Sequence, residues 1–445
     1  MSKIIIIGNG IAGITAARHI RKNSEHEIVV ISGESKYFFS RTALMYVYMG
    51  HMRFEDIKPY EDWFWKKNRI DLIQDWVEKI DYSKKELNLK SQGKISYDKL
   101  IFALGSKSNK FGWPGQDLKG AIGLYSKQDL ESIEEYSKTT KQAVIVGGGL
   151  IGIELAEMFV SRGIHVTFLV RENNFWGNIL PPEEGDLIMR HIRKHHIDLR
   201  LESELAEIID DGNGRVGSIK TISGEIISCQ MVGLAAGVSP NIDFLKNTEL
   251  ETKRGVLINT FFETNIPEVY SIGDCAEFKE PVVGRNALEQ VWYTGRIMGE
   301  TLAQTICGNR QPYNPGPWFN SAKFFDIEYQ TYGMVNAIIP ENENHFYWEH
   351  KSGEKCIHVV WDNTSGIFNG INTFGIRMRH DLFDNWLKKK VSIDEVMINL
   401  KTANFDPEFY TTYEQEILDD FNAKTGKNLK LKTKTWWRNL LPTNG

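Results

Sequence analysis

Two glycine-rich turns, each preceded by a run of branched apolar residues, constrain the fold more than any other feature of this sequence. The first turn lies in IIIIGNGIAGIT at residues 4–15, and the second lies in VIVGGGLIGIEL at residues 144–155. Each apolar run is typical of a buried parallel strand, and each is followed by a helical pattern and then by another strand-like run. The sequence therefore predicts two βαβ units and an α/β fold with two Rossmann-like domains.

The glycine spacing in both units is typical of dinucleotide binding. The first glycine permits a tight turn, the second lets the backbone approach a pyrophosphate, and the third allows close packing of helix on strand. Glu34 follows the first turn at about the 20-residue spacing at which a carboxylate accepts a hydrogen bond from a ribose hydroxyl. We therefore expect two dinucleotides, a tightly held flavin and a nicotinamide that delivers hydride to it. The glycines are Gly8, Gly10 and Gly13 in the first unit and Gly147, Gly149 and Gly152 in the second.

Composition excludes several other classes of protein. The 445-residue chain has a formal net charge of −5 and 41% hydrophobic residues. No apolar run approaches the roughly 20 residues that span a bilayer, and the amino terminus enters a strand without the features of a signal peptide. We expect a globular, cytoplasmic protein of several domains. The cysteines have no metal-ligand spacing and are interpreted as structural thiols; they are Cys229, Cys275, Cys307 and Cys356.

Further motifs follow in a recognisable order: YDKLIFALGS at 97–106, GLAAGVSPN at 233–241 and IPEVYSIGDCAEF at 266–278. Together with the glycine units, they resemble the FAD-dependent pyridine nucleotide–disulfide oxidoreductase superfamily, although the usual Ala-Thr-Gly is Ala103-Leu104-Gly105 here. The resemblance implies FAD as cofactor and NAD(P)H as substrate, with Asp274 binding the ribityl chain of the flavin. Further cofactor contacts are implied at Val77, Gly105, Gly237, Gly273 and Val291.

The resemblance also implies a discontinuous domain organisation. Residues 1–112 and 237–320 would bind FAD, and residues 113–236 would form an inserted NAD(P)-binding domain. Residues 321–445 would form a C-terminal α+β interface domain. There, YQTYGMV and IHVVWDNTSGIFNGINTF are typical of antiparallel strands, and helices are expected at RMRHDLFDNWLKKK and SIDEVMINLK.

The stretch YFFSRTALMYVYMG, residues 37–50, indicates the branch of the superfamily. Disulfide-reducing members carry cysteine here, and this stretch has none, so electrons would leave the flavin directly. The stretch is more similar to the ferredoxin and rubredoxin reductase branch, in which Arg41 would approach the pyrophosphate or the flavin; the alternative is a surface arginine. That branch has a lysine at the position of Tyr46. Glu154 therefore lacks its usual partner and either faces the nicotinamide–flavin contact or only stabilises its helix start.

The choice between NADH and NADPH stays open. Arg171 could bind the 2′-phosphate of NADPH, whereas Glu172 could accept a hydrogen bond from the 2′-hydroxyl of NADH and repel that phosphate. A strongly phosphate-selective pocket usually has more than one cation. We therefore write NAD(P)H.

Two further features have competing interpretations. His191 and His195 have the i, i+4 spacing that can bind zinc, but their setting in RHIRKHH favours a solvated helix end, and no metal site is predicted. The basic carboxyl-terminal tail with Trp436 and Trp437 is interpreted as a disordered or packed terminus; its alternative role is to contact an acidic partner or an anionic membrane surface.

These observations predict an NAD(P)H-dependent FAD oxidoreductase. Hydride would pass from nicotinamide to flavin, and electrons would then pass to a small redox protein similar to ferredoxin or rubredoxin, or to another acceptor that is not a disulfide. One alternative is a peripheral membrane NAD(P)H:quinone reductase, anchored through the basic tail. Another is a nicotinamide-sensing flavoprotein with a binding role. The sequence leaves the acceptor and the oligomeric state open.

Overall fold

The computed structural model describes residues 1–405 and 411–432 and divides the chain into two compact units. Unit 1 comprises residues 1–173 and 196–315, and unit 2 comprises residues 174–195 and 316–445. Residues 174–195 and 316–320, which the expected limits assign to the NAD(P)-binding and FAD-binding domains, cluster with unit 2. Among the described residues, none of the helices combines the length and the apolar character needed to cross a bilayer.

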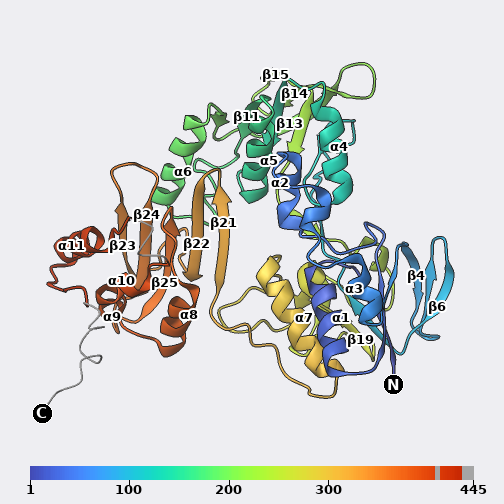
Figure 1. Ribbon diagram of the computed structural model, residues 1–445. Helices are drawn as coiled ribbons and strands as arrows, with labels where there is room; N and C mark the ends of the chain where they lie inside the picture. The colour runs from blue at the N-terminus through green and yellow to red at the C-terminus, as the bar shows by residue number, and fades with distance from the viewer. Residues whose placement is uncertain (406–410, 433–445) are drawn as a thin grey trace, which may run out of the picture. The chain divides into compact units, whose positions relative to one another are not determined.

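Unit 1 contains two five-stranded parallel sheets, and each is built around one of the predicted βαβ units (Figure 1). All neighbouring strands in both sheets run parallel, as in Rossmann-like folds. The first sheet has the order β19 (Val269–Ser271), β7 (Lys99–Phe102), β1 (Lys3–Ile7), β2 (Glu27–Ile31) and β3 (Ile70–Ile73). The second has the order β12 (Asp198–Arg200), β11 (His165–Leu169), β10 (Gln142–Val146), β16 (Met231–Leu234) and β9 (Ala121–Ile122).

The central strands are apolar on both faces because helices cover them. Residues 4–7 of β1 and 143–146 of β10 are all buried. Short sheets complete unit 1: β4 (Val77–Asp81), β5 (Glu86–Leu89) and β6 (Gly93–Ser96); β13 (Leu205–Asp210), β14 (Val216–Thr221) and β15 (Ile226–Ser228); β8 (Ser106–Ser108) with β17 (Val238–Pro240); and β18 (Val256–Ile258) with β20 (Ala276–Phe278). The helices of unit 1 are α1 (Ile11–Asn23), α2 (Leu44–Tyr48), α3 (Asp62–Lys67), α4 (Lys127–Ser137), α5 (Leu150–Ser161) and α7 (Trp292–Ile306).

Helices α1 and α7 lie side by side against the first sheet (Figure 1). Glycines on α7 allow this close approach, because a Cβ atom at Gly299 would overlap the carbonyl oxygen of Ala12. A segment near residue 300 therefore belongs to the same core as the amino-terminal strand. The first sheet and its helices thus unite chain segments that are far apart in the sequence. The edge strand β19 is a second example, because it follows the other four strands of the sheet by more than 150 residues.

Unit 2 is built on one antiparallel sheet with the order β21 (Phe319–Phe324), β22 (Ile327–Gly333), β25 (Phe368–Phe374), β24 (Cys356–Asp362) and β23 (Glu343–Glu349). Its helices are α6 (Pro182–Lys194), α8 (His380–Lys389), α9 (Ile393–Ile398), α10 (Leu400–Ala403) and α11 (Glu414–Thr425). The expected antiparallel strands and both expected helices are present. Residues 433–445, with Trp436 and Trp437, lie outside the described residues, so the interpretation of the tail stays a prediction.

Helix α6 packs on this sheet through a buried polar cluster. Glu184 accepts a hydrogen bond of 2.9 Å from Asn372 Nδ2 and lies 3.2 Å from His358 Nδ1, and all three side chains are buried. Helices α8, α9 and α11 contribute to an apolar core with the strands, which includes Phe383, Val396 and Phe421. Buried polar groups require partners, and this cluster therefore fixes the position of α6 on the sheet.

Candidate functional site

A cleft of about 1550 Å³ lies within unit 1. This volume exceeds the roughly 300–1,000 Å³ of ordinary small-molecule sites. The cleft reaches the amino-terminal end of α1, at Gly10 to Ala12, and also that of α5, at Leu150, Ile151 and Glu154. Nine of the predicted site residues line it: Gly8, Gly10, Glu34, Arg41, Val77, Gly105, Glu154, Gly273 and Asp274.

The first glycine turn has the geometry that a pyrophosphate requires. Gly8 has a φ of +110°, and a Cβ atom on it would overlap the carbonyl oxygen of Ala103. A Cβ atom at Gly13 would overlap the carbonyl oxygen of Gly8. Around Gly10, by contrast, no heavy atom of the described residues other than Gly10 and its two chain neighbours lies within 4 Å of the corresponding position. Gly8 and Gly13 are therefore required by the fold itself, whereas Gly10 leaves space for a ligand.

The second glycine turn repeats the first one closely. Gly147 has a φ of +114°, and a Cβ atom at Gly152 would overlap the carbonyl oxygen of Gly147. Gly149 precedes α5 in an extended conformation, as Gly10 precedes α1. The amide of Gly147 donates to Leu169 O at 3.0 Å, which matches the 2.8 Å bond from Gly8 N to Ile31 O. Both helix starts therefore present free backbone N–H groups in the same way.

Arg41 and Glu34, both predicted to contact a cofactor, pair with each other. Arg41 Nη1 donates to Glu34 Oε1 at 2.9 Å, and Nη2 donates to Oε2 at 2.7 Å. The guanidinium also lies 4.4 Å from the ring centroid of Tyr125. Glu34 Oε1 accepts a further bond of 2.9 Å from Lys127 N. A carboxylate offers about four acceptor positions, so Glu34 retains capacity for a ribose hydroxyl while it fixes the guanidinium.

Asp274 stands at the centre of a hydrogen-bond network on the cleft wall. Asp274 Oδ2 accepts bonds from Ser106 Oγ at 3.1 Å and from Tyr125 Oη at 3.3 Å. Gln290 Nε2 donates to Ser106 Oγ at 2.6 Å. Burial raises the pKa of Asp274, and the hydrogen bonds from Ser106 and Tyr125 offset part of this effect. A carboxylate held in this way is suited to accept hydrogen bonds from the hydroxyls of a ligand.

Sequence reasoning missed Tyr125 and Gln290, although both line the cleft. Tyr125 lies just before α4, and Gln290 lies just before α7, so neither belongs to a glycine motif. No pattern marks Tyr125, and next to Gln290 only the neighbouring Val291 is a predicted site residue. They reach Asp274 and Ser106 only because the fold brings together segments more than one hundred residues apart in the sequence.

Glu154 faces the same cleft from the start of α5. Burial, together with the like charge of Glu157, raises the pKa of Glu154 to about 7. Tyr46 occupies the position at which the ferredoxin and rubredoxin reductase branch has a lysine. Its ring is stacked against His51, with ring centroids 6.1 Å apart. Carboxyl groups that titrate near neutral pH inside a cleft are candidates for a functional role, so Glu154 stays a proposed site residue.

The remaining predicted residues lie outside the cleft lining. Arg171 Nη2 donates to its neighbour Glu172 at 2.9 Å, so the two residues with opposing nicotinamide preferences form an ion pair. Val291 caps α7, and its neighbours on both sides, Gln290 and Trp292, line the cleft. Gly237 has a φ of +83° immediately before β17. The two glycine turns described above contain the rest of these residues: Gly13, Gly147, Gly149 and Gly152.

The cysteine-free stretch lies against the cleft as expected, with Arg41, Thr42, Leu44 and Met45 in its wall. Cys229, Cys275 and Cys356 are buried, and Cys307 is partly buried; all four thiols are free. Cys275 follows Asp274 but packs behind the cleft wall, where Leu104 N donates to its sulfur at 3.3 Å. Burial raises the pKa of Cys275. These environments are typical of structural thiols.

Comparison with curated proteins identifies related chains. The chain is 31% identical over 322 residues to the NADH-rubredoxin oxidoreductase of Clostridium acetobutylicum, which covers 70% of this chain and 76% of that protein. It is 28% identical over 431 residues to the assimilatory nitrate reductase electron transfer subunit of Bacillus subtilis, which covers 95% of this chain and 54% of that protein. The chain spans about half the length of the first curated relatives that it matches.

Solved structures and family patterns agree with this result. A ferredoxin reductase from Rhodopseudomonas palustris superposes with a TM-score of 0.79 at 20% identity, over 93% of this chain and 99% of that one, which shows a shared fold. The predicted α/β class with Rossmann-like parts is thereby confirmed, and FAD and NAD(P)H are confirmed as the cofactor and substrate of the family. Residues 2–298 match the pattern of one family. The chain therefore belongs to the pyridine nucleotide-disulphide oxidoreductase family.

Proposed function

We propose that the protein is an NAD(P)H-dependent FAD oxidoreductase that passes electrons from the flavin directly to a small redox protein of the ferredoxin or rubredoxin type. FAD supplies the hydride and electron chemistry when bound, and the protein holds and aligns the reactants. The observation that carries the proposal is the cleft in unit 1, which reaches the amino-terminal ends of both α1 and α5. Two dinucleotides bound at these two helix starts would have their reactive rings in one space.

The chain supplies each cofactor with its own set of residues. In this proposal the FAD-binding domain is formed by residues 1–112 and 237–320, and the NAD(P)-binding domain by residues 113–236. Asp274 holds the ribityl chain, and Arg41, kept in place by Glu34, faces the pyrophosphate or the flavin. Since FAD and NAD(P)H are held largely by backbone groups, side chains mainly orient them. FAD contacts are assigned to Gly8, Gly10, Gly13, Glu34, Arg41, Val77, Gly105, Gly237, Gly273, Asp274 and Val291, and nicotinamide contacts to Gly147, Gly149, Gly152, Glu154, Arg171 and Glu172.

The acceptor is proposed from two observations. The cleft wall at residues 41–45 carries no cysteine, so the electrons have no sulfur relay on this side. The relative from Clostridium acetobutylicum is named for rubredoxin, which is a small iron protein. The first observation argues against a disulfide acceptor, and the second favours a protein carrier over a quinone. A cytoplasmic location, where NAD(P)H is available, completes the proposal.

Anaerobic titration of the purified protein tests this function. We expect about one FAD per chain, bleached by NADH or NADPH, because two complete dinucleotide turns are present. The reduced protein should then be assayed with rubredoxin, with a ferredoxin, and with a quinone in anionic liposomes. We expect kcat/KM for one of the small iron proteins to exceed that for the quinone by at least about tenfold. A colourless protein that gains no flavin on reconstitution would contradict the proposal, and faster reduction of the quinone would favour the membrane alternative.

The same preparation tests the role of sulfur. We expect full reduction of the flavin by one NAD(P)H, without a thiolate-to-flavin charge-transfer band. Cys275→Ser should change the rate constant of flavin reduction by less than about threefold, because a buried thiol with a raised pKa holds little of the reactive thiolate. Cys307→Ser, far from Asp274 in the sequence, is the matched control. A long-wavelength band that Cys275→Ser abolishes would show a redox-active sulfur instead.

A further inference from the structure

Three potential metal ligands converge in unit 2, and none of them lines the cleft of unit 1. His191 and His195 lie at the carboxyl-terminal end of α6, and Asp326 lies in the turn between β21 and β22. His191 Nε2 is 2.6 Å from Asp326 Oδ1, and His195 Nε2 is 3.4 Å from the same oxygen. The two imidazole Nε2 atoms are 3.2 Å apart. One ligand atom from each residue therefore faces a common point.

The prediction of a solvated helix end is wrong for His191, which is 3% exposed. His191 follows Leu187 by four residues and Ile188 by three, so it lies on the same face of α6 as these apolar residues. This face is buried, and Ile192 is buried with it. His195 caps the carboxyl-terminal end of the helix, directly after Lys194, and keeps 32% of its side chain exposed. The site is thus enclosed on the side of His191 and open on the other side, where the side chain of Asp326 is 70% exposed.

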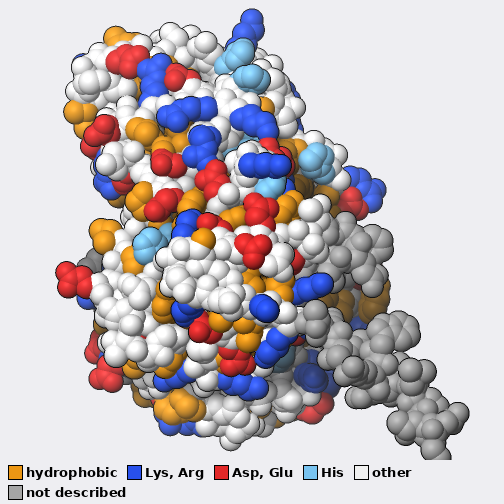
Figure 2. All heavy atoms as spheres, turned by 90° about the vertical axis from the view of Figure 1, so that its left-hand side faces the viewer, with side chains coloured by type: hydrophobic (Ala, Val, Ile, Leu, Met, Phe, Trp, Pro, Cys, Tyr) orange, Lys and Arg blue, Asp and Glu red, His pale blue; other side chains and the backbone are white. Residues whose placement is uncertain are grey.

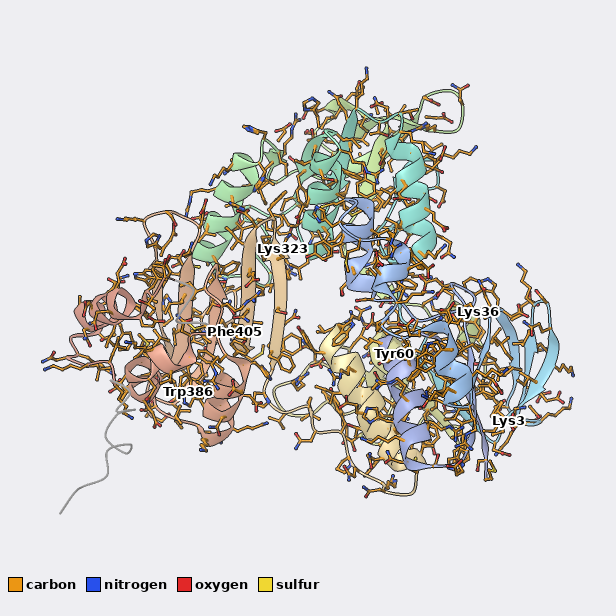
Figure 3. The ribbon with its side chains drawn as sticks, viewed as in Figure 1. Lys3, Lys36, Tyr60, Lys323, Trp386 and Phe405 are labelled. Carbon is orange, nitrogen blue, oxygen red and sulfur yellow. The ribbon has the colours of Figure 1, made fainter. Side chains whose placement is uncertain are left out.

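The turn that carries Asp326 is held in an unusual conformation. The strands β21 and β22 pair up to Phe324 and Ile327, which leaves Phe325 and Asp326 as a two-residue turn. Phe325 has a φ of +56°, a region that bulky residues rarely adopt. Its ring stacks on His195, with centroids 4.1 Å apart and planes inclined by 11°. The aromatic contact therefore fixes the position of His195 relative to the turn. In Figure 3 the turn can be found from the label of Lys323, which lies on β21 just before it.

The spacing of the ligand atoms fits a tetrahedral ion. With metal–ligand bonds of about 2.0–2.1 Å, ligand atoms in a tetrahedral zinc site lie about 3.3 Å apart. Two of the three separations here, 3.2 and 3.4 Å, already have this value. The third, 2.6 Å, is that of a hydrogen bond between His191 and Asp326 and would lengthen when an ion enters. The adjustment is confined to the exposed carboxylate of Asp326.

A hydrogen-bonded cluster without an ion explains the arrangement less well. Without an ion, either both Nε2 atoms carry protons, which then meet across 3.2 Å, or one of them turns a lone pair toward Asp326 Oδ1. A cation removes this conflict, since both nitrogens then present lone pairs. The carboxyl-terminal end of a helix also favours positive charge. Lys194, between the two histidines in sequence, pairs with Glu354, so a carboxylate balances its charge.

We propose that His191, His195 and Asp326 bind one divalent transition-metal ion, for which zinc has the best matching ligand preference. Two imidazoles and one carboxylate form three of the four positions of a zinc site, and water takes the fourth on the open side. The ion joins the end of α6 to the β21–β22 turn and so stabilises unit 2. Figure 2 shows histidine side chains at the surface among acidic and basic ones. An ion can enter the proposed site from solvent on the side of Asp326, whose side chain is 70% exposed.

The tag-free, EDTA-treated full-length protein should be titrated with zinc sulfate by calorimetry. We expect one zinc per chain. His195→Ala and Asp326→Asn should each weaken binding by at least about 100-fold, because even the loss of an outer-shell partner costs roughly 10–100-fold. His350→Ala, which removes a partly exposed histidine of the same unit, is the matched control and should bind as the wild type does. Equal affinities in all four proteins, or no saturation at one equivalent, would overturn the proposal.

Two further readouts separate metal loss from misfolding. Cobalt(II) in a tetrahedral site of nitrogen and oxygen ligands gives visible d–d bands, which should appear in the wild type and in His350→Ala only. Zinc should raise the Tm of the same two proteins and leave that of Asp326→Asn unchanged. Asp326→Asn keeps a side chain of nearly the same shape in an exposed turn, so its Tm without metal should match that of the wild type without metal. Cobalt bands in Asp326→Asn as strong as in the wild type would overturn the assignment of Asp326.

Discussion

Gly10→Val is expected to give a folded protein without bound FAD. Apart from Gly10 and its two chain neighbours, no heavy atom of the described residues lies within 4 Å of a Cβ atom at this position, and the backbone at Gly10, with a φ of −71°, suits any residue. The valine side chain would therefore clash with the ligand alone. Overpacking costs about 1–3 kcal/mol or more. Because about 1.4 kcal/mol corresponds to a factor of ten in affinity, the upper part of this range weakens FAD binding by about 100-fold or more.

Gly149→Val is the matched variant in the second turn. It should keep its flavin, because Gly149 belongs to the βαβ unit of the other sheet, and it should lose rapid reduction of the flavin by NAD(P)H. Flavin absorbance after gel filtration measures the first property, and anaerobic stopped-flow absorbance measures the second. If Gly149→Val lost the flavin and Gly10→Val kept it, the two sites would have been assigned in the wrong order. Gly13 is unsuitable for this comparison, because any side chain there would overlap the turn itself.

The features that the sequence predicts well are those encoded within one short segment. Gly8, Gly10 and Gly13 act within a single turn, so their spacing alone indicates their geometry. The parallel strand pairs follow from the same local pattern, because a βαβ unit joins adjacent parallel strands. The absence of cysteine from residues 37–50 likewise needs no structure to be seen.

Contacts between distant segments could not be predicted in the same way. Tyr125 and Asp274 meet through the fold, and no pattern near either residue indicates the other. The contact between Asp326 and His191 could likewise not be predicted, since 135 residues separate them in the sequence. Helix α6 illustrates the same limit, because Glu184 pairs with residues of β24 and β25 that follow much later in the chain. Buried polar partners of this kind decide which unit a helix joins.

Glu154→Gln is expected to stabilise the apoprotein at alkaline pH. The pKa of Glu154 is raised from 4.5 to about 7, with burial as the main cause. Between pH 4.5 and 7 the unfolded chain therefore binds fewer protons at this group than the folded chain does, so the free energy of unfolding falls as pH rises. At 1.36 kcal/mol for each pH unit, the wild type loses about 3 kcal/mol by pH 8. A neutral glutamine removes this loss.

Urea unfolding of the apoprotein at pH 5 and at pH 8 measures the effect. The variant should be more stable than the wild type by about 3 kcal/mol at pH 8, and the difference should fall to about 1 kcal/mol or less at pH 5, where both side chains are neutral in the folded state. Glu135→Gln is the control, because Glu135 is 66% exposed and pairs only with Lys138 at the surface. In the holoprotein, a carboxyl that titrates beside the nicotinamide should give the rate constant of flavin reduction an inflection near pH 7 that Glu154→Gln lacks. Parallel pH profiles for wild type and variant would show that no titration of Glu154 affects the transfer, which would leave it only the stabilisation of the α5 helix start.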